Sequence, residues 1–210
     1  MRGHALASTR LGIGADDAAI AFLDVAAARW HNPRAVWPFR RKSRIRADDL
    51  FSKWFRPQVP EGYPSLEAFE TAITDEETEL LPKTLAKLAM DGVERIFQVR
   101  KHDLDPDREG LVFLDGLLNA EMRWKLTEGQ DPTYPRNLFR VVATEFGCIV
   151  GEIWVRTGRG AWAPRRAPNH WRSAVRRPGG EEYDPFRAVV RKMSDERRDA
   201  GLAAAYDAAR

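Results

Sequence analysis

The segment from Leu138 to Trp154 constrains the fold of this chain more than any other. Apolar residues recur in it at steps of three and four, the spacing of one face of an α-helix: Leu138, Val142, Phe146, Ile149 and Ile153. Ala143, Gly147 and Gly151 lie four apart on an adjacent face, which predicts that another backbone approaches closely there. We therefore expect a tightly packed amphipathic helix in this part of the chain.

The hydrophobic period changes directly after this helix. Thr157–Gly160 has the composition of a turn, Ala161–Ala163 predicts a short strand, and His170–Arg176 predicts a second strand with alternating apolar positions. Asp184 as N-cap and Pro185 at the first helical position then predict another helix. The order helix, basic hairpin, helix follows from these signals.

Helical patterns also dominate the chain before Leu138. Residues 47–55 carry apolar side chains at helical spacing, Ser65 is placed to cap a short helix, and Thr74–Glu77 has the form of a capping box. The expected fold is α+β and mainly α: a helical domain with a C-terminal two-stranded β-hairpin flanked by helices. We expect residues 47–194 to form a single globular domain, followed by a peripheral C-terminal helix over 195–210.

The N-terminal 46 residues differ from this domain and are expected to form a flexible basic arm. Residues 1–35 are rich in alanine, glycine and arginine. The composition changes at Val36, where the sequence continues as Val-Trp-Pro-Phe-Arg-Arg-Lys. Because a GTG start codon reads as valine when it is translated as internal, we interpret 1–35 as a start-site artefact with translation beginning at Val36. The segment Trp37–Arg46 offers an alternative role in peripheral membrane contact, since basic and aromatic residues favour an anionic surface.

Composition restricts the remaining classes. The chain has 210 residues, a net charge of +3 and one cysteine, Cys148, which fits a reducing, cytoplasmic compartment. Its apolar runs are far shorter than the ~20 residues of a membrane span. Residues 57–152 hold 19 Asp/Glu against 10 Lys/Arg, whereas residues 153–210 hold 13 Lys/Arg against 7 Asp/Glu. The two blocks either bind each other or serve partners of opposite charge.

The segment His102–Glu109 has the aspartate alternation of a calcium loop. The motif fails because Arg108 replaces the required glycine and Leu114 stands where a bidentate glutamate belongs. Capping explains the same residues, with Asp105 as N-cap and Pro106 at the first helical position. We expect neither a metal nor a cofactor.

Three features of the C-terminal half resemble a pattern of uncharacterised bacterial domains, in which an amphipathic helix with Gly-Glu, a hairpin with tryptophan and an Asp-Pro-Phe helix follow one another. The corresponding residues here are Gly151-Glu152, Trp162 and Asp184-Pro-Phe186. The resemblance implies an α+β arrangement and no activity.

The hairpin region, residues 155–177 (the basic hairpin), contains no acidic residue and is the expected binding surface. Its candidate binding residues are Arg156, Arg159, Trp162, Arg165, Arg166, His170, Trp171, Arg172 and Arg176. We expect a non-catalytic protein-interaction module in which a protein partner, or self-association, supplies the acidic complement. Two other interpretations of these arginines are open. They neutralise the acidic helices of the same chain, or they bind nucleic acid together with the stacking tryptophans.

A hydrolase-type enzyme is the third class. The chain has no nucleophile elbow, zinc motif, phosphate loop or dinucleotide fingerprint, so we assign no catalytic residue. A catalytic site would have to be assembled from distant residues, of which Glu145, Glu152, His102 and His170 are the first to inspect. Solvent-facing positions are the simpler expectation for the two glutamates.

Overall fold

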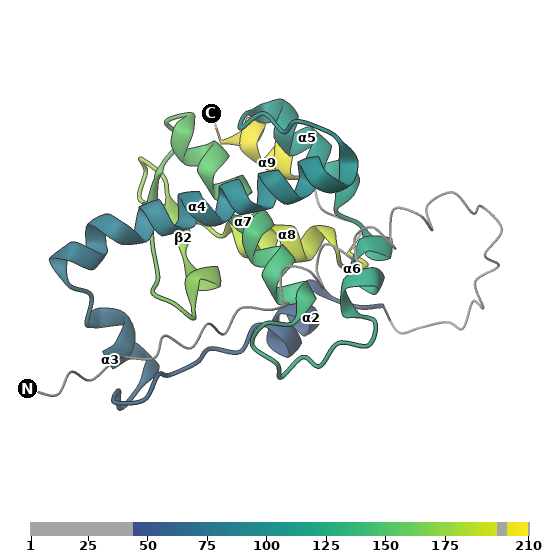
Figure 1. The fold of residues 1–210 in the computed structure, drawn as a ribbon. Coiled ribbons are helices and arrows are strands. Elements are labelled where there is room, and N and C mark those ends of the chain that lie inside the picture. Colours follow the sequence, from purple (N-terminus) through teal and green to yellow (C-terminus); the bar gives the residue numbers. More distant parts are fainter. Residues whose placement is uncertain (1–43, 197–200, 210) are drawn as a thin grey trace, which may run out of the picture. The chain divides into compact units, whose positions relative to one another are not determined.

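The computed structural model describes residues 44–196 and 201–209, which belong to one compact unit (Figure 1). Residues 1–43 lie outside the described part, and with them the expected start at Val36 and most of the proposed membrane-contact segment. Of that segment only Arg44–Arg46 are described. Arg44 donates a hydrogen bond to the main-chain oxygen of Asp195.

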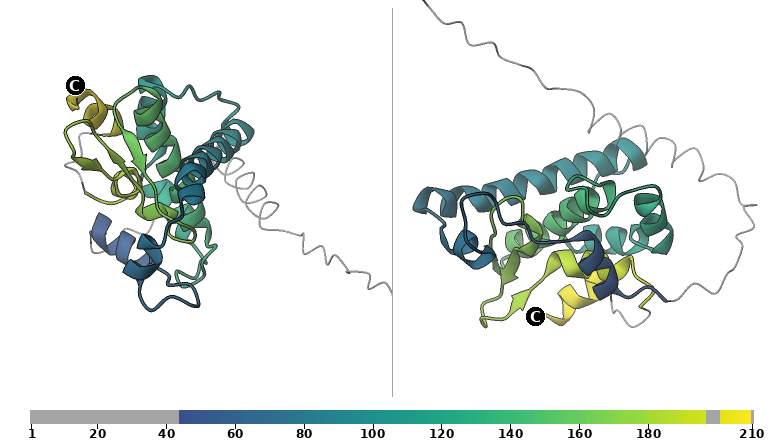
Figure 2. Two further views of the ribbon diagram at one scale, coloured as in Figure 1. Left: turned by 90° about the vertical axis from the view of Figure 1, so that its left-hand side faces the viewer. Right: turned by 90° about the horizontal axis from the view of Figure 1, so that it is seen from below.

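The described chain is mainly helical with one small sheet, as the expected α+β class requires (Figures 1 and 2). Its helices and strands, in chain order, are α2 (Ala47–Trp54), α3 (Leu66–Thr71), α4 (Asp75–Arg100), α5 (Arg108–Leu117), α6 (Ala120–Thr127), α7 (Leu138–Arg156), β1 (Ala161–Ala163), the 3₁₀ helix η1 (His170–Arg172), β2 (Ala174–Arg176), β3 (Glu182–Tyr183), α8 (Pro185–Lys192) and α9 (Leu202–Ala208).

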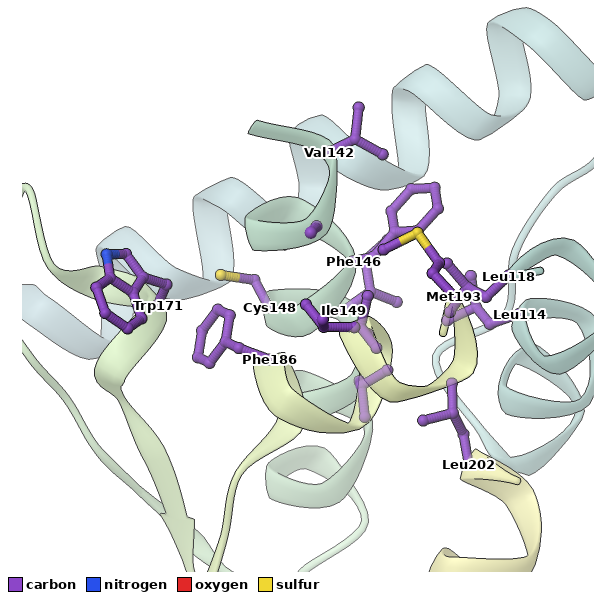
Figure 3. Close-up of a cluster of buried hydrophobic side chains, with 14 of the residues drawn as sticks. Leu114, Leu118, Val142, Phe146, Cys148, Ile149, Trp171, Phe186, Met193 and Leu202 are labelled. Carbon is purple, nitrogen blue, oxygen red and sulfur yellow. The ribbon is translucent and has the colours of Figure 1, made fainter. Parts of the chain in front are cut away.

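Helix α7 lies at the centre of the core, between α4 on one side and α8 on the other. Four of the five residues in its predicted stripe are buried, and so are most of its other side chains. Figure 3 shows Phe146 beside Met193, which directly follows α8, and Phe186 beside Cys148. The helix is therefore buried nearly all round, which a single apolar stripe does not indicate.

The glycines of α7 make room for aromatic side chains. A Cβ added at Gly147 would lie 2.3 Å from the Phe186 ring, and one added at Gly151 would lie 1.9 Å from the Trp162 ring. The predicted close approach is present, but rings rather than a neighbouring backbone fill the space. The Trp162 ring packs on Gly151 and the Phe186 ring on Gly147, and the two ring centroids are 6.4 Å apart. The three features of the bacterial pattern are therefore packed together.

Local capping signals are mostly confirmed. The Ser65 hydroxyl accepts from the Ala68 amide, Thr74 and Glu77 form the full capping box, and Asp184 caps α8. The cap of α5 lies two residues later than predicted: Asp107, not Asp105, accepts from the amides of the first turn. Within α4, Pro82 lies early in one continuous helix.

The sheet has three strands rather than two. β2 pairs antiparallel with β1 and with β3, so the turn at Pro178–Gly180 leads into a further strand. The predicted strand over His170–Arg176 begins instead with the 3₁₀ turn η1, and only Ala174–Arg176 pair. Trp171 of η1 is buried against Phe51 of α2 and against Phe55, which caps the C-terminal end of that helix.

The C-terminal helix α9 contributes Leu202, Ala203 and Tyr206 to the core, although the sequence predicts a peripheral element. It packs on α5, and Asp115 accepts from its first amides. No helix in residues 44–196 and 201–209 is long and apolar enough to cross a membrane.

Replacing Gly147 by alanine should lower the free energy of unfolding by about 1–3 kcal/mol, because the fully buried Phe186 ring has no room to move. Urea denaturation measures the effect. Gly116→Ala is the matched control: nothing lies within 4 Å of its added Cβ, and alanine is the better helix former. Equal losses in the two variants would contradict this account of α7.

Candidate functional site

The arginines of the basic hairpin do not form one open surface. Arg165 and Arg172 both reach Glu70 of α3, at 3.9 Å and 2.9 Å. Arg166 pairs with Glu77 at 2.9 Å, in the first turn of α4. These side chains therefore tie the hairpin to the acidic helices of the same chain.

Arg166 shows how closely this contact is built. Its Nη1 donates to the main-chain oxygen of Phe69 at 3.1 Å, and its guanidinium lies 4.6 Å from the centre of the Phe69 ring. A hydrogen bond from the Thr74 amide, together with Arg166, lowers the pKa of the Glu77 carboxyl. These polar contacts are partly exposed, and they join Arg166 to other residues of the same chain.

Two further hairpin arginines hold the end of α9. The Arg159 guanidinium stacks 3.6 Å from the centre of the Tyr206 ring and donates to the Tyr206 main-chain oxygen. Arg177 donates to the main-chain oxygen of Ala209. Cations at a helix C-terminus satisfy free carbonyls and favour the helix dipole.

Trp171 is buried and His170 is partly buried. The Nδ1–H of His170 donates to the Arg165 carbonyl at 2.8 Å, and burial lowers the pKa of the imidazole, so the ring is neutral at neutral pH. Trp171 is part of the aromatic cluster with α2. Arg176, at the end of the central strand β2, remains exposed and pairs with Glu182 of β3.

Trp162 and Arg156 converge on Glu152 of α7. The Trp162 indole donates to Oε1 at 2.8 Å, and the Arg156 Nε donates to Oε2 at 3.1 Å. The Glu152 side chain is only 10% exposed, whereas that of Arg156 is 49% exposed. An i,i+4 ion pair of this exposure contributes only ~0.3–0.5 kcal/mol to stability. The hydrogen bond from Trp162 therefore does more than Arg156 to hold the carboxylate in place.

Glu152 and Arg156 also line an open groove between α4, α7 and the α4–α5 loop, with a volume of about 330 Å³. Its remaining lining residues are Ala89, Met90, Val93, Glu94, Leu104, Pro106 and Ile149. The floor is apolar, and Met90 is 64% exposed beside it. Glu94 of α4 lines the groove, and Asp103 and Asp105 flank its lining residue Leu104 in the sequence. We call these three acidic residues the acidic rim.

The residues named as the first to inspect for an assembled catalytic site each have another role. Glu145 accepts two hydrogen bonds of 2.8 Å from Arg95 of α4, which makes it a buried structural partner rather than the solvent-facing residue expected. Glu152 is likewise buried. His102 stacks on Phe113. No group of three or more His, Cys, Asp or Glu in the described ranges is arranged to hold a metal.

Sequence reasoning missed the groove because its lining comes from three separate segments. One signal was available: Met90 and Phe97 are seven residues apart on α4, hence on one face, and both are exposed, whereas Leu81 and Leu85 of the same helix are buried. Apolar residues that a helix places outside its buried face indicate a contact surface.

Cys148 should resist iodoacetamide in the native protein and react on unfolding. Burial, with the nearby carboxylates of Glu152 and Glu145, raises the pKa of its thiol, and the reactive species is the thiolate. Because it is the single cysteine, mass spectrometry in increasing urea measures its exposure directly. Rapid labelling of the folded protein would contradict a buried α7.

Arg159→Gln should loosen α9. Loss of a charged hydrogen bond and of the stack on Tyr206 removes ~1.5 kcal/mol, so the amides of Leu202–Ala208 should exchange about tenfold faster. Hydrogen–deuterium exchange measures this rate. Arg176→Gln is the control, because that side chain is 63% exposed and far less constrained. Unchanged exchange in Arg159→Gln would show that the contact is incidental.

Comparisons with protein families, curated proteins and solved structures found no match to this chain.

Proposed function

We propose that this protein is a non-catalytic interaction module that binds an apolar, basic segment of a partner protein in the α4–α7 groove. The observation that carries this proposal is an apolar floor, open to solvent at Met90, beneath an acidic rim. Interaction sites commonly combine an exposed apolar patch with a polar border. The acidic rim favours a basic partner by charge complementarity.

The groove supports this role better than the basic hairpin does. A partner or nucleic acid bound by Arg165, Arg166 or Arg172 would have to displace the carboxylates of Glu70 and Glu77. Binding at the groove leaves the pairs of Glu70 and Glu77 intact, and it covers Met90, whose side chain is 64% exposed. Burying one methionine side chain fully contributes about 1.5–3 kcal/mol.

Synthetic amphipathic helices test the proposal. One peptide of about four helical turns carries leucine on one face and lysine on the other, and a second replaces every lysine by glutamate. We expect the Leu/Lys peptide to bind, with weaker binding at higher salt, and the Leu/Glu peptide to bind at least tenfold more weakly. Isothermal titration calorimetry measures both affinities.

Met90→Gln should weaken binding of the Leu/Lys peptide about tenfold, because it makes the floor polar at nearly constant shape. Leu80→Gln is the matched control, since Leu80 is also on α4 and 47% exposed but does not line the groove. Binding that is equal in the two variants, or absent in the wild-type protein, would overturn the proposal. Loss of binding on Arg165→Gln but not on Met90→Gln would move the site to the basic hairpin.

A further inference from the structure

We propose that Glu152 recognises a basic side chain of the bound segment, and that Arg156 occupies its carboxylate in the free protein as an intramolecular stand-in. This inference rests on the proposed function and specifies which contact selects the partner. It comes from three properties of Glu152: its burial, its fixed orientation and the weakness of one of its two partners.

The orientation of Glu152 is fixed from behind. Trp162 donates to Oε1, and the Trp162 ring is itself held against Gly151, where no Cβ would fit. The carboxylate therefore has one face secured by β1 and lies along the wall of the groove. A carboxylate has about four acceptor positions, so the two hydrogen bonds present leave capacity for another donor.

Arg156 is easily displaced from that carboxylate. It uses only Nε, and its two terminal nitrogens have no hydrogen-bond partner among the described residues. Its side chain is half exposed, so it would exchange one contact with Glu152 for solvent at small cost. A guanidinium or ammonium from a partner would meet the same carboxylate inside an apolar groove, where water competes less.

Charge on the groove favours a cation over an anion. The formal charges of Glu152 and Arg156 cancel, and Glu94 adds a negative charge on the lining. Asp103 and Asp105 on the adjoining loop extend the negative rim. An anionic partner would gain the exposed nitrogens of Arg156 but would meet these three carboxylates.

Two variants distinguish the roles of the pair. Glu152→Gln keeps an acceptor for Trp162 and loses the charge, so it should weaken binding of the Leu/Lys peptide about tenfold. A peptide with glutamine in place of lysine should bind this variant and the wild type equally. Arg156→Gln should strengthen binding of the Leu/Lys peptide several-fold, because the competing cation is gone. Thermal unfolding followed by tryptophan fluorescence verifies that both variants are folded.

Glu79→Gln is the charge-matched control, because Glu79 is exposed on α4 and does not line the groove. It should change affinity less than twofold. A tenfold loss in Glu79→Gln, or a loss in Glu152→Gln that also affects the glutamine peptide, would overturn selective recognition by Glu152. Weaker binding in Arg156→Gln, combined with binding of the Leu/Glu peptide, would assign an anion to Arg156 instead.

Failure of this inference is separable from failure of the proposed function. If Met90→Gln weakens binding of the Leu/Lys peptide while Glu152→Gln does not, the groove binds its partner without this carboxylate. In that case only the inference about Glu152 is wrong. If neither variant changes the affinity, or no peptide binds, the proposed function falls and takes the inference with it.

Discussion

The burial of α7 on nearly every side is the constraint on which the rest of the structure depends. This helix brings Arg140, Glu145 and Glu152 into the interior, where an uncompensated charge costs several kcal/mol. Arg95 satisfies Glu145 from α4, and Trp162 satisfies Glu152 from β1, while the Arg140 Nη2 donates to the main-chain oxygen of Pro168. Burial of α7 therefore fixes where α4, β1 and the loop before η1 must lie.

The basic hairpin shows how charge that is unbalanced in sequence becomes balanced in space. Arg166 meets Glu77 and Arg172 meets Glu70, about a hundred residues earlier in the chain, and Arg159 meets the end of α9. The two ion pairs are partly exposed, and each contributes little to stability alone. Together these contacts hold α3, the first turn of α4 and the end of α9 against the hairpin.

The groove and the hairpin are consequently two surfaces of different character. Polar contacts within the chain occupy the arginines, whereas Met90 and the neighbouring apolar floor remain open. Glu152 links the two, since the same carboxylate accepts from the hairpin tryptophan and faces the groove. The resemblance to a bacterial pattern of Gly-Glu, tryptophan and Asp-Pro-Phe thus corresponds to one packed unit rather than three separate signals.

Local signals were sufficient for the class of fold, for the long central helix and for the caps at Ser65, Thr74 and Asp184, because each depends on residues a few positions apart. They did not reveal that Glu145 and Glu152 are buried, that β3 completes the sheet, or that Leu104 and Met90 line the same groove. Those facts depend on contacts between distant segments, whose energies become effective only once α7 is enclosed. A run of arginines indicates charge, but whether that charge faces a partner or the protein's own glutamates depends on which surfaces folding brings together.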